Sequence, residues 1–181
     1  MRSKKKKQIY IVLSQSGSII SLILKRITGA QYNHASISLS EDLDCMYSFG
    51  RKYTYFPFLG GFVKESTDFG TLKRFKNTKA LVMRLDLGEE DYENIRSRII
   101  EMLVDKKHYH YNYLGLLLGG INIVWKQEHC YYCSEFVRDL LQSVDAEGCE
   151  VLDPIVHPMQ FLDIPKAEVI YTGRLCDYTA S

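Results

Sequence analysis

The sequence predicts an α+β fold, because segments with the two-residue period of strands alternate with segments that have the 3.6-residue period of helices. Hydrophobic residues make up 46% of the chain and charged residues 25%, as in an ordinary globular domain. A length of 181 residues suits one domain. We therefore expect a single domain over residues 1–181, with a basic, disordered tail over residues 1–7.

Short apolar or alternating runs between turn residues predict the strands. In the run 34–39, His34, Ser36 and Ser38 fall on one face, and a turn at Glu41 and Asp42 leads into the returning strand of a hairpin. The aromatic, glycine-containing segment 51–65 is expected to be an ordered loop. Its part 53–62 either covers an apolar cleft or packs on itself. The predicted strands are 8–13, 34–39, 45–49, 71–75, 81–87 and 168–172.

Apolar residues at helical spacing predict four helices and one short helical turn. The helix over 88–103 has acidic residues in its first turn, where they suit the helix dipole. The apolar run 114–125 is too short for a membrane span and contains three glycines and an asparagine, so it is expected to be part of a buried helix. The other helices are 16–27, 113–124 and 133–144, and the turn begins at Pro158.

Charge and cysteine content exclude several classes of protein. The chain carries 23 basic and 22 acidic side chains, a balance that argues against a nucleic-acid-binding protein. The lysines at 4–7 are expected to be a solvated tail, and the alternative is contact with a membrane surface or a nucleic acid; the sequence allows membrane contact but does not indicate it. The apolar run 9–13 is too short for a signal peptide, and five cysteines are an odd number for a disulfide framework. We expect a reduced, cytoplasmic protein.

Cys133 has the position of an activated thiol. With Phe136, Val137, Leu140 and Leu141 it forms the apolar stripe of its predicted helix, and it lies in the first turn. Unpaired backbone N–H groups and the helix dipole favour a thiolate there, and the same groups can hold an oxyanion. The alternative is that Cys133 is a small core residue.

His34 is the best candidate for the base that would activate this thiol, because it opens a strand, and a strand is a rigid support. The alternative is a hydrogen-bonded strand histidine without a catalytic role. The other histidines are expected at the surface (His108 and His110), beside the helix start (His129) and before a helical turn (His157). Cys130 and Cys133 form a lone C-x-x-C, which lacks the second pair of a zinc site and the strand–helix context of a redox motif.

Two segments together resemble the circularly permuted papain-like amidases of the YiiX type, which are related to NlpC peptidases and lecithin–retinol acyltransferase. Residues 28–38 (TGAQYNHASIS) resemble the histidine strand of that family, and residues 131–137 (YYCSEFV) resemble its nucleophile helix. The histidine precedes the cysteine by 99 residues, which is the order of the permuted group. Together with residues 111–118 and the opening strand, the resemblance covers about 8–172.

The resemblance implies a papain-like antiparallel sheet or partial barrel, with the nucleophile Cys133 at a helix N-terminus and His34 as its base. It also implies a third polar residue on the next strand, and the position that matches is Ser48, with Tyr47 or Asp44 as alternative alignments. Family members usually carry His, Asn, Gln or Glu at this position. A serine can orient the ring but adds no charge to stabilise an imidazolium.

The expected function is that of a thiol hydrolase or acyltransferase that acts on an amide, ester or thioester. Its substrate would be a small molecule, lipid or peptide that carries an acyl group, and no cofactor or metal is expected. The alternative is a ligand-binding or protein-binding module of the same fold that has lost most of its chemistry, which the neutral Ser48 would favour.

Overall fold

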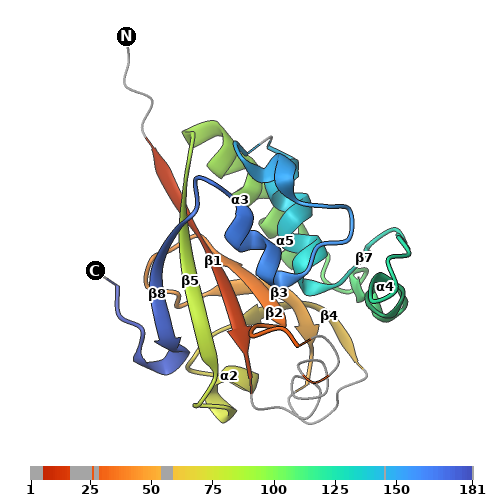
Figure 1. Cartoon of the computed structure of the whole chain (residues 1–181), viewed down its shortest axis with the longest axis horizontal. Helices are drawn as coiled ribbons and strands as arrows, with labels where there is room; N and C mark the ends of the chain where they lie inside the picture. The colour runs from red at the N-terminus through yellow and green to blue at the C-terminus, as the bar shows by residue number, and fades with distance from the viewer. Residues whose placement is uncertain (1–5, 17–25, 27–28, 54–58, 145, 181) are drawn as a thin grey trace.

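The computed structural model describes residues 6–16, 26, 29–53, 59–144 and 146–180, and these form an eight-stranded mixed sheet with helices (Figure 1). The strand order is β7-β6-β4-β3-β2-β1-β5-β8, and every neighbouring pair is antiparallel except the parallel pair β6 and β7. The strands are β1 (Lys7–Gln15), β2 (His34–Ser38), β3 (Met46–Arg51), β4 (Gly60–Glu65), β5 (Lys79–Leu87), β6 (His110–Tyr111), β7 (Cys130–Tyr131) and β8 (Glu168–Arg174).

The central strand β1 is buried on both faces because its side chains alternate between two apolar clusters. Ile9, Ile11 and Leu13 face the larger cluster, to which α3 (Glu89–Val104) and α5 (Cys133–Gln142) contribute. Tyr10 and Val12 belong to the smaller cluster, which includes residues of α2 (Gly70–Arg74) and of the C-terminal 3-10 helix (Leu175–Asp177). The remaining helical elements are α4 (Tyr113–Gly119) and the 3-10 helices Cys149–Val151 and Pro158–Asp163.

Most of the predicted elements are confirmed to within a few residues. The strands expected at 8–13, 34–39, 45–49, 81–87 and 168–172 correspond to β1, β2, β3, β5 and β8, and the helices 88–103 and 133–144 correspond to α3 and α5. The helical turn expected at Pro158 is also present. The helix expected over 16–27 lies almost entirely outside the described residues, as do most of the basic tail and part of the segment 53–62.

Two predictions near β4 are wrong. The segment 71–75 is helical in α2, where Leu72 is buried while Lys73 and Arg74 are exposed, so no strand partner is needed. The segment 51–65 is not all loop, because β4 pairs with β3 from Met46 opposite Glu65 to Arg51 opposite Gly60. The glycines that suggested a loop have a packing reason, since a Cβ at Gly61 would lie 2.6 Å from the Tyr109 carbonyl oxygen.

The helix expected over 113–124 ends at Gly119, and the prediction that this helix is buried is wrong. Gly120 follows, and Asn122 has a left-handed backbone with φ of 59°, which ends the helical repeat. Large apolar side chains of α4, such as Leu114 and Leu117, are exposed. Among the described helices, none combines the length and the hydrophobicity that a membrane span requires.

Candidate functional site

The N-terminus of α5 presents Cys133 as the first residue of the helix, as predicted. The thiol is buried, with 3% of the residue exposed. The first turn is held in place because the backbone N–H of Tyr132 donates to a Glu135 carboxylate oxygen at 3.4 Å, and the Ser134 hydroxyl donates to the Val156 carbonyl at 2.7 Å. The helix therefore enters the core with its N-terminal N–H groups beside the thiol.

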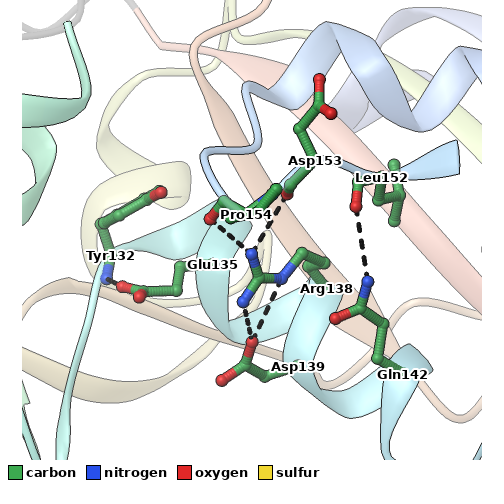
Figure 2. Close-up of polar contacts among 8 residues, drawn as sticks. All are labelled: Tyr132, Glu135, Arg138, Asp139, Gln142, Leu152, Asp153 and Pro154. Carbon is green, nitrogen blue, oxygen red and sulfur yellow. Dashed lines mark hydrogen bonds and ion pairs between the residues drawn. The ribbon is translucent and has the colours of Figure 1, made fainter. Parts of the chain in front are cut away.

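Most of the polar face of α5 is also buried, which the amphipathic pattern did not indicate: Ser134, Glu135 and Arg138 are buried, whereas Gln142 is exposed. Figure 2 shows Arg138 reaching the chain that follows the helix, where its guanidinium donates to the carbonyls of Asp153, at 3.1 Å, and of Pro154. The same group pairs with Asp139, and Gln142 donates to the Leu152 carbonyl at 3.4 Å. These bonds satisfy a buried charge and fix the axis of α5 relative to residues 152–154.

The structure brings Cys133 and His34 together. Their side chains are hydrogen-bonded, and the backbone N–H groups of Ala35 and Ser134 also donate to the Cys133 sulfur. One N–H group comes from the start of α5 and the other from β2, so the sulfur lies where the helix end meets the strand. That environment favours a negative charge on sulfur.

The partner on the other side of the His34 ring is Glu65, at the end of β4. Nε2 of His34 lies 3.0 Å and 3.1 Å from the two Glu65 carboxylate oxygens, which leaves Nδ1 as the ring nitrogen available to Cys133. The Ser36 hydroxyl donates to Glu65 at 2.6 Å and holds the carboxylate in place. Cys133, His34 and Glu65 thus form a chain of contacts, an order that would suit a nucleophile, a base and a carboxylate that orients the base.

The expectation that Ser48 orients the ring is corrected by this geometry. Ser48 is fully buried, and its hydroxyl donates to the Ala35 carbonyl at 2.6 Å, which is a structural bond between β3 and β2. Tyr47 and Asp44, the alternative alignments, form no hydrogen bond or ion pair with His34 among the described residues. Sequence reasoning missed Glu65 because it placed that residue at the end of a loop, whereas β4 is the strand that follows β3.

The charges of the site support one another. Burial raises the pKa of Cys133, but the hydrogen bond and the charge of His34 lower it by a larger amount. The pKa therefore lies below that of an ordinary thiol. Burial lowers the pKa of His34, yet Glu65 and Cys133 raise it well above its usual value. For Glu65 the pKa is lowered, because His34, Ser36 and Arg51 outweigh the effect of burial. The three groups therefore favour a thiolate, an imidazolium and a carboxylate.

Tyr111, on β6, is a further residue of the site that the sequence did not single out. Its hydroxyl is hydrogen-bonded to Cys133, and burial together with the nearby thiolate raises the pKa of Tyr111 well above its usual value. The phenol consequently stays protonated and can donate a hydrogen bond. Its ring packs against Tyr113, the first residue of α4, with centroids 4.6 Å apart.

The remaining candidate residues lie outside this site. Cys130 is a free thiol on β7, and burial raises its pKa. The described part of the chain contains no group of three or more His, Cys, Asp or Glu residues that could hold a metal. His108, His110 and His129 are exposed, and His157 precedes the 3-10 helix at Pro158, where its backbone N–H donates to Gln160 at 2.7 Å.

Comparison of the chain with known proteins finds no matching family model, no matching curated protein and no matching solved structure. The α+β architecture and the geometry around Cys133 therefore carry the functional argument.

Proposed function

We propose that this chain is a cysteine-dependent hydrolase or acyltransferase with a circularly permuted papain-like fold, acting on an amide, ester or thioester. The observation that carries the proposal is the contact chain from Cys133 through His34 to Glu65, whose members come from α5, β2 and β4. An isolated buried cysteine needs no such partners, whereas a nucleophile needs a base and a group that orients the base. The order along the chain, with the histidine strand first, is that of the permuted group.

The mechanism follows from the positions of these groups. The Cys133 thiolate attacks the carbonyl carbon of the substrate, and the carbonyl π electrons move to oxygen. The Ser134 backbone N–H and the Tyr111 hydroxyl, both beside the sulfur, are placed to donate to that oxyanion. As the carbonyl re-forms, the bond to the leaving group breaks, and His34 delivers its proton to the departing nitrogen, oxygen or sulfur.

The second half of the reaction releases the acyl group from Cys133. Neutral His34 removes a proton from water or from an acceptor nucleophile, which attacks the thioester carbonyl and expels the Cys133 thiolate. Glu65 keeps the imidazole oriented and stabilises its charged form in both halves. Water as the nucleophile makes the protein a hydrolase, and an alcohol, amine or thiol makes it an acyltransferase.

The experiment that tests this function follows an acyl group onto the protein. Incubation with short-chain and long-chain p-nitrophenyl esters should release a burst of nitrophenol, and intact-mass spectrometry should find one acyl group on Cys133. Cys133→Ser should abolish the burst, whereas Cys176→Ser, which removes an exposed thiol, should leave it unchanged. A burst that persists in Cys133→Ser, or an acyl group on Cys176, would contradict the proposal.

The alternative of a binding module with little chemistry loses its main argument. That alternative was favoured by an uncharged third residue, Ser48, whereas the residue on His34 is the carboxylate Glu65. A carboxylate stabilises the imidazolium electrostatically, which a serine hydroxyl does not.

A further inference from the structure

We infer that the exposed apolar surface around α4 docks this protein onto an anionic phospholipid membrane. Large apolar side chains rarely gather in the open on a soluble domain without a function. Here Leu117 is 72% and Ile121 66% exposed, and five neighbours in sequence are at least 44% exposed. In Figure 1, α4 and the segment that follows it lie at one end of the sheet, beyond β7. This α4 surface consists of Tyr113, Leu114, Leu117, Ile121, Ile123, Val124 and Trp125.

Hydrogen bonds of Asn112 fix the conformation of the α4 surface. This buried side chain accepts from the Gly115 backbone N–H at 2.7 Å and donates to the Trp125 carbonyl at 3.0 Å, so it closes the segment from the start of α4 to Trp125. The Asn112 backbone N–H donates to the Tyr131 carbonyl at 2.9 Å and ties the segment to β7. The apolar side chains are therefore exposed on a segment whose backbone is held by hydrogen bonds.

Positive charge borders the α4 surface. Arg51 interacts electrostatically with Tyr113. Lys52 follows Arg51 and is exposed, and its side chain lies against Gly61 of β4, the strand that pairs with β6. Lys126 directly follows Trp125 and is exposed. None of these three cations lies within 4.0 Å of a carboxylate oxygen in the described part of the chain. The exposed Lys52 and Lys126 are therefore available to lipid phosphates, whereas Arg51 also faces the Glu65 carboxylate.

The composition of this surface fits a lipid surface better than a protein partner. Aliphatic side chains flanked by a tryptophan, a tyrosine and lysines are the combination found at membrane interfaces, where the aromatic rings sit among the headgroups and the ammonium groups pair with phosphate. Protein interfaces, in contrast, are depleted in lysine. Two of the three cations here are lysines.

Docking at this surface would bring the candidate site to the membrane. The Tyr113 ring packs against Tyr111, whose hydroxyl is bonded to Cys133, so α4 begins one ring contact away from the thiol. An acyl lipid is then the substrate class that the docked protein meets first. This choice of substrate rests on the proposed function, whereas the docking itself does not.

The chain carries a built-in probe for this inference, since Trp125 is its single tryptophan. On titration with phosphatidylglycerol–phosphatidylcholine vesicles, the Trp125 emission should shift to shorter wavelength, and the protein should sediment with the vesicles. Pure phosphatidylcholine vesicles should bind much more weakly. Adding about 0.5 M NaCl should weaken binding to the anionic vesicles, because salt screens the lysine–phosphate attraction.

Leu117→Ser combined with Ile121→Ser should weaken vesicle binding by about tenfold or more, because it removes the two most exposed apolar groups of the surface. The matched control is Val104→Ser combined with Val151→Ser, which changes exposed apolar residues elsewhere and should bind as the wild type does. All four positions are exposed, so circular dichroism and thermal unfolding should confirm that both variants fold.

Equal binding by the Leu117/Ile121 variant and the wild type, or equal binding to neutral and anionic vesicles, would overturn the inference. A second result would also overturn it. If the wild type self-associates in gel filtration and binds no vesicles, and the Leu117/Ile121 variant no longer self-associates, then a second copy of the chain covers the α4 surface. Cys133→Ala should bind vesicles normally, which separates failure of docking from failure of the proposed chemistry.

Discussion

Replacing Glu65 by Gln should sharply slow the reaction of Cys133 with an alkylating agent near pH 6. The variant keeps the shape of the side chain but removes the charge that faces His34 Nε2 at 3.0 Å. Hydrogen bonds to charged groups contribute about 1.5–3 kcal/mol. Because Glu65 is 16% and His34 23% exposed, we take a value near the middle of that range, about 2 kcal/mol. A loss of that size corresponds to about thirtyfold less of the thiolate–imidazolium pair.

The assay is alkylation by iodoacetamide, followed by mass spectrometry of the Cys133 peptide across pH 5 to 9. The exposed thiol of Cys176 provides an internal reference in every sample. His34→Ala should slow the reaction at pH 6 at least as much as Glu65→Gln, because it removes the cation itself, although the N–H groups of Ala35 and Ser134 keep part of the effect. If Glu65→Gln reacts at pH 6 at the wild-type rate, then Glu65 does not support the imidazolium and the reasoning fails.

Three further predictions concern stability and are checked by urea unfolding. Ser48→Ala should lower the free energy of unfolding by about 1–2 kcal/mol, because it leaves the buried Ala35 carbonyl without its hydroxyl donor; it should leave the Cys133 alkylation profile unchanged, and a changed profile would return Ser48 to the site. Arg138→Leu should cost about 3 kcal/mol, since it strands the carbonyls of Asp153 and Pro154 and the Asp139 carboxylate; a loss below about 1 kcal/mol would contradict the anchoring of α5. The wild type should lose stability more steeply than Glu65→Gln on acidification from about pH 5 to 3. The pKa of Glu65 in the folded protein lies below the ordinary 4.5. The stability that the Glu65 charge contributes is therefore present above pH 4.5 and is lost as the pH falls through the folded pKa. Parallel curves for the two proteins would show that Glu65 makes no such contribution.

The sequence was informative wherever one element alone determines the answer. The periodicity of residues 133–141 placed Cys133 at the head of a helix, and the alternation after His34 made it the start of a strand, because both patterns reflect local geometry. Both positions were correct. The predictions failed where a residue type has two possible explanations. Gly60 and Gly61 are typical of a loop in the local sequence, but in β4 their lack of side chains allows close packing.

The pairing of distant segments determined the rest of the site. Glu65 lies 31 residues from His34, and it reaches the imidazole only because β3 pairs with both β2 and β4. Tyr111 reaches Cys133 in the same way, because β6 runs beside β7 just before the start of α5.

The sequence by itself thus determined the α+β class of the fold and the positions of Cys133 and His34 at the starts of their elements, since amphipathic period and helix-terminus chemistry are local properties. The tertiary structure alone decided that the Glu65 carboxylate contacts His34, that most of the polar face of α5 is buried, and that large apolar residues of α4 are exposed. The physical reason is that burial depends on what packs against a segment. A hydrophobic run such as 114–125 has the same composition whether it is covered by the sheet or exposed beside the candidate site.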